Sequence, residues 1–226
     1  MTTFELLAVA RGEQPADTLF HDARLVNVLS GEIHPANVAV AGGVVVGWGD
    51  YDAREVVDLD GAYLAPGLLD AHVHIESSLL GVGEFARAVA ARGTTGAFVD
   101  PHEVANVCGV AGVEWVLAAA REVPVDLYVN VPSCVPASPY DDPGAVLDAA
   151  AVAELLGREG VVGLAEMMNY PATIAGDPEV LAKLAAAGER PRDGHAPGIS
   201  GRDIMAYSLA GPESDHECTS ADEALA

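Results

Sequence analysis

The hydrophobic pattern changes partway along the chain and predicts two parts. In the first part, after a short amphipathic helix over Phe4–Arg11, brief β-branched runs such as Val38–Val40 and Val44–Val46 are separated by glycine-rich turns. Runs of this length between turn signals are typical of strands in a small antiparallel unit. We therefore expect a small β domain over residues 1–65, followed by a second domain over residues 66–226.

In the second part, apolar runs of strand length alternate with helix-length segments. The expected strands are 68–75, 97–99, 125–131 and 161–165, and the expected helices are 79–92, 104–122, 145–158 and one that begins at Asp177-Pro178. Strand, helix and strand repeated in this way indicate right-handed βαβ units and a parallel sheet, which makes the fold class α/β. A (β/α)8 barrel and a doubly wound open sheet are both built from such units.

Polar residues at the strand ends favour the barrel. The chemically capable residues that follow the expected strands are, in chain order, His72 and His74, then Asp100 with His102 and Glu103, then Glu166, His195 and His216. A barrel gathers active-site side chains from several strand ends, whereas a doubly wound sheet binds at one switch point with a phosphate fingerprint. The segment 81–86 matches G-x-G-x-x-A, but no acidic residue other than Asp100 ends the next strand, so we disfavour a nucleotide site.

His72 and His74 are the first candidate metal ligands. Side chains two residues apart on a strand share one face, so both imidazoles reach the same point. Neutral imidazole is a common ligand of zinc-like metals, but two imidazoles are too few to hold an ion unaided. A chance His-x-His on a half-buried strand is the alternative, and the polar strand ends that follow argue against it.

The charge of the chain excludes some partners. Asp and Glu number 34 against 11 Lys and Arg, the formal net charge is -23, and Lys183 is the only lysine. Nucleic acids and anionic membranes attract basic clusters, so we expect neither as a partner. An acidic surface almost free of lysine is typical of halophilic proteins, whose self-repulsion is screened by salt. An ordinary acidic protein of a mesophile is the alternative.

The N-terminus and the cysteines predict where the protein works. Met1–Arg11 lacks the basic and apolar regions of a signal peptide, and no apolar stretch has membrane-spanning length. The three cysteines are far apart and form no CxxC, which indicates reduced thiols. We therefore expect a cytoplasmic protein.

Five segments of the second part resemble, in order, the sequence blocks of the adenine deaminases, a family of the amidohydrolase superfamily. They are Pro66–Ser78, Asp100–Gly109, Ala165–Asn169, Asp193–Gly198 and Ser214–Cys218. The resemblance implies a metal-dependent hydrolase with a (β/α)8 TIM barrel and a small β-sandwich-type domain. It also implies that adenine is the substrate and that water, activated by two divalent ions, converts it to hypoxanthine and ammonia in purine metabolism.

The resemblance also implies roles for particular residues. The implied metal ligands are His72 and His74 on one ion, Glu166 as a bridge, and His195 and His216 on the other, with manganese expected first and iron or zinc as alternatives. The implied catalytic residues, which handle protons or contact purine nitrogens, are Asp100, His102 and Glu103, and Ser77 is a candidate substrate contact. For Ser77 and Ser78 we favour a different role, as caps of a helix that begins at Leu79.

One departure from the family stands out. Adenine deaminases continue for two more barrel strands, and their eighth strand supplies an Asp that binds metal and handles protons, whereas about six strands are expected here. We therefore expect an N-terminal portion of a deaminase, with a homo-oligomer or a complementing C-terminal fragment as possible protein partners. Another amidohydrolase acting on a cyclic amide, or an inactive fragment that only binds metal, are the alternatives.

The acidic composition leads to a prediction about salt. With a net charge of -23, the melting temperature should rise from dilute to molar salt, because the screening length falls from about 30 Å at 0.01 M to about 3 Å at 1 M. Thermal unfolding followed by circular dichroism at several potassium chloride concentrations measures this. A melting temperature indifferent to salt would contradict the halophile interpretation.

Overall fold

The computed structural model describes residues 1–225, and it divides into two compact units, Met1–Pro66 and Gly67–Ala226. Each unit has its own buried core. None of the helices in the described residues is long and apolar enough to cross a membrane.

The first unit combines one helix with a five-stranded sheet. Helix α1 (Thr3–Ala10) begins with a capping box in which Thr2 and Glu5 satisfy each other's backbone N–H groups. The strands are β1 (Ala16–Asn27), β2 (Glu32–Ala41), β3 (Val44–Trp48), β4 (Ala53–Asp58) and β5 (Tyr63–Leu64). A small core forms where Val9 of α1 packs with Ala16 and Leu19.

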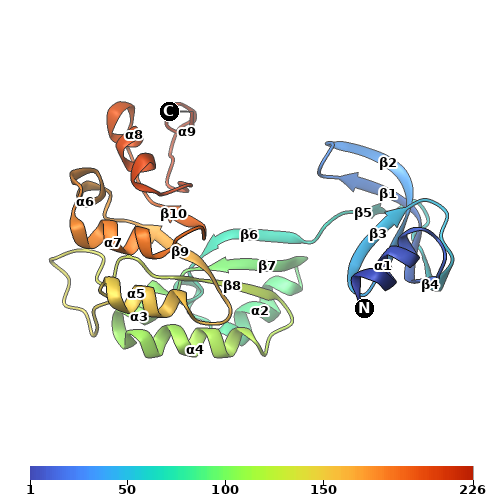
Figure 1. Cartoon of the computed structure of the whole chain (residues 1–226), viewed down its shortest axis with the longest axis horizontal. Helices are drawn as coiled ribbons and strands as arrows, with labels where there is room; N and C mark the ends of the chain where they lie inside the picture. The colour runs from blue at the N-terminus through green and yellow to red at the C-terminus, as the bar shows by residue number, and fades with distance from the viewer. Residues whose placement is uncertain (226) are drawn as a thin grey trace. The chain divides into compact units, whose positions relative to one another are not determined.

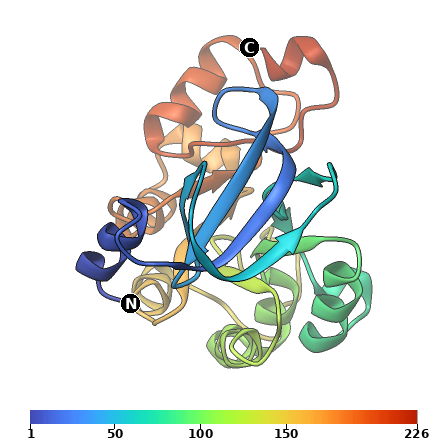
Figure 2. The same ribbon diagram turned by 90° about the vertical axis from the view of Figure 1, so that its right-hand side faces the viewer.

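The strand directions in this sheet correct one expectation. The pairs β1–β2 and β2–β3 are antiparallel as predicted, and Figure 2 shows β1 and β2 as two long ribbons side by side. Strands β4 and β5, however, pair with the other edge of β1 and run parallel to it. Because β2 already occupies one edge of β1, the later strands use the free edge. Turn residues mark where strands end but do not encode which edge the next strand joins.

The second unit alternates strands and helices. Its strands are β6 (Leu68–Val73), β7 (Thr94–Val99), β8 (Asp126–Val131), β9 (Val161–Met167) and β10 (Arg192–Gly194). Its helices are the 3-10 turn η1 (Glu76–Ser78) and α2 (Val82–Ala90), α3 (His102–Cys108), α4 (Val110–Ala120), α5 (Ala149–Leu156), α6 (Tyr170–Ala175), α7 (Pro178–Ala186), α8 (Gly201–Ala210) and α9 (Ala221–Ala224). All five strands are parallel and lie in chain order, as Figure 1 shows. A doubly wound sheet would reverse its strand order, so this unit is wound as a barrel.

The sheet is curled rather than flat. Four strand spacings separate β6 from β10, which is about 19 Å in a flat sheet. Yet His72 Nδ1 on β6 lies 4.0 Å from Asp193 Oδ2 on β10, which two side chains can reach only across a concave face. Helix α2 packs against β7, α4 against β8, and α5 against β8 and β9. The unit is therefore an incomplete TIM barrel, as predicted.

The described part of the barrel has five hydrogen-bonded strands. The segment Ser214–Cys218, where a sixth strand was expected, is not a strand. Residues 212–219 run beside β10, but Glu213 N to Arg192 O, at 2.9 Å, is the one backbone hydrogen bond between them. The remaining links are made by side chains, because Gly194 N donates to Ser214 Oγ at 3.3 Å. Polar side chains thus replace the regular ladder of a strand here.

Two predicted helices also differ from expectation, one by a break and one by a later start. The helix predicted over 104–122 is split at Gly109, whose φ of +62° and ψ of -143° favour glycine. The helix predicted at Leu79 begins at Val82 with Gly81 as its cap. Ser77 and Ser78 lie in η1 instead, so our expectation that they cap that helix is wrong.

The barrel core generates a prediction about stability. Leu155 of α5 is fully buried in the core between helices and sheet, so Leu155→Ala should lower the free energy of unfolding by about 2–5 kcal/mol. Leu181→Ala on α7, where the leucine is 37% exposed, is the matched control and should cost about 1 kcal/mol or less. Urea unfolding of both variants measures this, and equal losses would contradict the assigned core.

Candidate metal centre

The carboxyl ends of the barrel strands bring the predicted polar residues together. His72 lies in β6 and His74 just after it, Asp100 follows β7, and Glu166 lies near the end of β9. His195 directly follows β10. Parallel strands end on the same side of the sheet, so residues far apart in sequence meet here.

The carboxylate of Glu166 stands at the centre of this cluster. The residue is only 2% exposed. Its Oε1 lies 3.2 Å from His74 Nε2, 3.4 Å from His102 Nδ1 and 3.8 Å from His72 Nε2. Its Oε2 lies 2.5 Å from His195 Nδ1 and 3.1 Å from His216 Nε2. Each oxygen of one carboxylate therefore faces a different group of imidazoles.

The spacing of the donor atoms suits a metal ion. A tetrahedral ion with ligands about 2.1 Å away separates its donors by about 3.4 Å. His72 Nε2 and His74 Nε2 are 3.0 Å apart, and they lie 3.8 and 3.2 Å from Glu166 Oε1. Two groups of donors that share Glu166 are close enough to hold an ion: one contains His72, His74 and Asp100, and the other contains His195 and His216.

A backbone contact sets the orientation of His74. Its Nδ1 lies 2.9 Å from the carbonyl oxygen of Asp100. A carbonyl oxygen can only accept, so Nδ1 carries a proton and Nε2 is directed at Glu166. This is the arrangement that a metal-binding histidine needs, because the hydrogen bond at one nitrogen fixes the tautomer and the ring orientation.

The cluster shifts the pKa values of its members. Burial alone would raise the pKa of Glu166, but hydrogen bonds from His102, His74 and His195 outweigh burial and hold it well below its usual range. The hydrogen bond to Glu166 raises the pKa of His74 to about 9, against the effect of burial. Burial lowers the pKa of His102, yet its hydrogen bonds with Asp100 and Glu166 raise it to about 10. Without metal, the anionic carboxylate of Glu166 is thus held by the protonated imidazoles of His74 and His102.

Glu103 and Ser77 form a pair at the edge of the centre. Ser77 Oγ donates to Glu103 Oε1 at 2.7 Å, and Glu103 Oε2 lies 3.9 Å from His74 Nδ1. Glu103 Oε2 is also buried without a hydrogen-bond partner among the described residues. The hydroxyl of Ser77 therefore holds one oxygen of Glu103 and leaves the other directed toward the imidazoles.

A second layer of polar residues supports the cluster, and sequence reasoning missed it. Asn130 Nδ2 donates to Asp193 Oδ2 at 2.9 Å, and Ser214 Oγ donates to Asp193 Oδ1 at 3.2 Å. The hydroxyl of the buried Tyr207 donates to Met167 O at 2.7 Å and accepts from His195 N at 2.9 Å. Asp193 and Ser214 lie in two of the segments singled out by resemblance, which was an available signal. Tyr207, on α8, had none.

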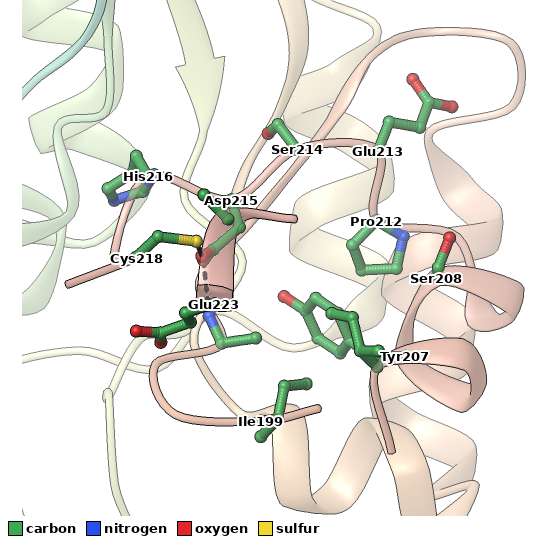
Figure 3. A pocket seen from close by; sticks show the side chains of 13 residues that line it. Ile199, Tyr207, Ser208, Pro212, Glu213, Ser214, Asp215, His216, Cys218 and Glu223 are labelled. Atoms are coloured by element: carbon green, nitrogen blue, oxygen red, sulfur yellow. Dashed lines mark hydrogen bonds between the residues drawn. The ribbon is translucent and has the colours of Figure 1, made fainter. Parts of the chain in front are cut away.

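The segment that carries His216 borders a cavity of about 420 Å³. Figure 3 shows Asp215 and Cys218 close together on this segment, with Tyr207 of α8 across from them. Asp215 Oδ1 accepts from Ala196 N at 2.9 Å and its Oδ2 accepts from Cys218 Sγ at 3.1 Å. Asp215 therefore ties the segment of His216 to the residues after His195, although neither segment is a regular strand.

Lys183 does not lie between the two imidazole groups. Lys183, the single lysine of the chain, lies on α7, and its Nζ donates to Ser133 O at 3.0 Å. The carboxylate of Glu166 occupies the position between the two imidazole groups instead.

A curled parallel barrel with a buried carboxylate between two histidine groups is the arrangement of a metal-dependent hydrolase. Residues 63–226 match the model of the Amidohydrolase family, which is more than half of the chain, and the chain belongs to this family.

Curated relatives agree with this assignment. The adenine deaminase of Dehalococcoides mccartyi (strain ATCC BAA-2266 / KCTC 15142 / 195) is 50% identical over 221 residues, and that of Methanoregula boonei (strain DSM 21154 / JCM 14090 / 6A8) is 51% identical over 220 residues. In both cases the match covers 97% of this chain and 39% of the relative. The chain thus spans well under half the length of the curated relatives it matches.

A solved structure supports the fold. N-acyl-D-glutamate deacylase from Bordetella bronchiseptica, crystallised with zinc and a phosphonate inhibitor, is similar with a TM-score of 0.58 at 18% identity, covering 92% of this chain and 53% of that protein. A beta-aspartyl dipeptidase from Fervidobacterium islandicum AW-1 is similar with a TM-score of 0.51 at 14% identity, covering 85% of this chain and 54% of that protein. At such low identity these similarities concern the fold alone.

The donor geometry predicts the effect of removing two ligands. Replacing His72 and His74 together by alanine should abolish tight binding of divalent metal on the Oε1 side of Glu166 and so lower the metal content, because that side then loses both imidazoles. Elemental analysis of purified and dialysed protein measures this. Replacing His21 and His34, which lie in the first unit, is the matched control and should leave the metal content unchanged. Equal metal content in both double variants would refute the assignment.

The raised pKa values predict how pH acts on the centre. Metal must displace the proton of His74, whose pKa is about 9, so metal affinity should rise about tenfold per pH unit for each proton displaced and level off above about pH 9. The metal-free protein should show the opposite trend. A histidine whose pKa is raised on folding stabilises the fold below its unfolded value of about 6.5, and this contribution is lost as pH rises through about 9.

Isothermal titration calorimetry at several pH values, in parallel with melting temperatures of the chelator-treated protein, measures both trends. A metal affinity that does not change between about pH 6 and pH 8 would show that His74 is already unprotonated in the metal-free protein.

Proposed function

We propose that this chain forms the metal-binding part of an adenine deaminase, which hydrolyses adenine with one water to hypoxanthine and ammonia. The observation that carries the proposal is the buried carboxylate of Glu166, with one oxygen toward each of two histidine groups. This arrangement suits two divalent ions joined by a carboxylate bridge. The choice of adenine rests on the relatives, which are named adenine deaminases and are about 50% identical over nearly the whole chain.

The donor set suits several metals. All predicted donors are imidazole nitrogens and carboxylate oxygens, and none is a thiolate, which fits manganese or iron(II) as well as zinc. We propose manganese first. When bound, such ions lower the pKa of water and thereby supply a nucleophile at neutral pH. In the proposed assignment His72 and His74 hold one ion, His195 and His216 hold the other, and Glu166 holds both.

His102 and Glu103, at the edge of the metal centre, serve proton transfer. Deamination at a purine carbon requires a proton for the leaving ammonia and a hydrogen-bonding group for the ring nitrogens. His102, with a pKa of about 10, carries a proton at neutral pH and can donate it. Glu103, with one oxygen held by Ser77 and the other free, can accept one. Ser77 then acts through Glu103, which is a positioning role, and the substrate contact implied by the resemblance stays a prediction.

Because the relatives are more than twice as long as the match, we assign the activity to this chain together with a complementing C-terminal segment, or with further copies of the chain. A cytoplasmic location and a halophilic source stay predictions of the sequence.

An assay of ammonia release from adenine tests the proposal. We expect little or no turnover by the metal-loaded 226-residue chain alone, and turnover when the C-terminal segment of the Dehalococcoides adenine deaminase is added. Loss of one proton-handling group typically costs about 10²- to 10⁴-fold, so the gain on complementation should be at least of this size. Hypoxanthine formation, followed by its ultraviolet absorption, confirms the product.

Two controls sharpen this assay. Glu166→Gln keeps the shape of the side chain but removes the charge of the bridge, so the complemented variant should be inactive. A cyclic amide such as dihydroorotate is offered to the same mixture. Hydrolysis of the cyclic amide without deamination of adenine would show that the protein is an amidohydrolase that acts on cyclic amides instead. Rapid deamination by the isolated chain would show that His102, Glu103 and the ligands within residues 1–226 suffice and that no complementing segment is needed.

A further inference from the structure

We propose that Tyr207 is a positioning residue whose hydroxyl acts as a spacer between the two strand ends that carry Glu166 and His195. The spacer keeps the imidazole of His195 where it can share a metal ion with Glu166. The proposal rests on the metal centre of the proposed function and deepens it, because a residue outside the ligand set then determines how well one of the two ions is held.

The first observation is a hydroxyl inserted between two neighbouring strands. Strands β9 and β10 are parallel, and Met167 lies opposite Gly194 where both strands end. At the next residue, the backbone N–H of His195 donates to Tyr207 Oη at 2.9 Å, and this hydroxyl donates to Met167 O at 2.7 Å. A side chain of α8 thus bridges the two backbone groups and holds them further apart than a direct N–H···O=C hydrogen bond would.

The second observation is that this hydroxyl is buried and fully used. Tyr207 is 2% exposed and Met167 is 0% exposed. The carbonyl of Met167 can only accept, so the hydroxyl donates its proton there and receives the N–H of His195 on its oxygen. Buried backbone groups are rarely left without a partner. Removal of the hydroxyl therefore favours a direct bond between the two backbone groups, which draws the strand ends together.

The third observation is the close packing at Gly194, which makes room for the tyrosine. A Cβ atom at Gly194 would lie 3.1 Å from both Cε1 and Oη of Tyr207, and it would overlap with Ser214 O. A side chain at this position would therefore displace either the ring or the segment that carries His216. The absence of a side chain at Gly194 lets the hydroxyl reach the backbone on both strands.

The backbone contacts of Glu166 predict which ion depends on Tyr207. The carbonyl of Glu166 accepts from Ser133 Oγ at 2.5 Å and from Met168 N at 3.1 Å, so Glu166 is held without Tyr207. The backbone N–H of His195, in contrast, is held by the hydroxyl. Loss of the hydroxyl should therefore displace the imidazole of His195, whose Nδ1 lies 2.5 Å from Glu166 Oε2. The imidazoles beside Oε1 lie on other segments and should stay in place.

Metal titration of the 226-residue chain tests the proposal without an activity measurement. Tyr207→Phe keeps the ring and removes the hydroxyl. Zinc affinity on the Oε2 side of Glu166 should fall about 10- to 100-fold, which is the loss typical of residues that orient a ligand, and affinity on the Oε1 side should be unchanged. Calorimetry measures both affinities, and the single variants His72→Ala and His195→Ala assign each binding event to its side. With cobalt(II) as the probe, the visible absorption of the ion on the Oε2 side should change.

Three comparisons separate positioning from a loss of stability. Leu155→Ala weakens the core but keeps the hydroxyl, so its folded form should bind zinc as the wild type does. Tyr128→Phe makes the same substitution where the ring stacks on Phe98, and it should also bind zinc normally. In the background of His195→Ala, Tyr207→Phe should have no further effect on zinc affinity, because it acts through His195. Equal weakening of both ions in Tyr207→Phe would show a merely structural role and overturn the proposal.

A measurement on the wild-type protein covers the case in which Tyr207→Phe does not fold. If the hydroxyl holds His195 before metal binds, the backbone N–H of His195 should exchange with deuterium much more slowly than a free amide in the metal-free protein. Exchange at the rate of a free amide would contradict the proposal.

The outcomes also distinguish this proposal from the proposed function. If the wild-type chain binds two ions and Tyr207→Phe binds both with the same affinities, only the role of Tyr207 fails and the proposed metal centre stands. If the wild-type chain binds no divalent ion, the metal centre itself is wrong, and the role of Tyr207 fails with it.

Discussion

The buried carboxylate of Glu166 is the constraint on which the rest of the second unit depends. A charged group at 2% exposure is tolerated only if both oxygens are satisfied by hydrogen-bonding partners or by metal. Four separate chain segments provide these partners, from β6 to the segment of His216. The fold must therefore bring the ends of its parallel strands to one point, and the curl of the sheet achieves this.

Polar residues outside the predicted ligand set support the centre by binding backbone groups next to the ligands. Tyr207 joins the chain after Glu166 to the backbone of His195, and Asp215 joins the segment of His216 to the residue after His195. These contacts explain how ligands on irregular segments keep defined positions. In metal centres such supporting residues determine affinity nearly as much as the ligands themselves.

The anionic centre also clarifies the division between holding metal and moving protons. His74 and His102 both face Glu166, but His74 is oriented by a backbone carbonyl and His102 by the carboxylate of Asp100. A backbone contact fixes one tautomer permanently, which suits a ligand. A contact with an ionisable side chain leaves His102 able to exchange its proton.

The sequence by itself determined the class of fold and located most of the residues of the proposed donor set. The alternation of strands and helices is local, and His72, His74 and Glu166 stand at strand ends that apolar periodicity locates, whereas His195 follows β10 (Arg192–Gly194), which has no apolar run. Tertiary structure alone decided that β4 and β5 run parallel to β1. It also decided that the segment of His216 is held by side chains instead of a sheet ladder, and that Ser77 donates a hydrogen bond to Glu103. The physical reason is that these contacts join residues far apart in the sequence. The pairing of β4 and β5 depends on which edge of β1 is free, and a contact such as that of Tyr207 with His195 forms only in the folded chain, so no local pattern encodes either.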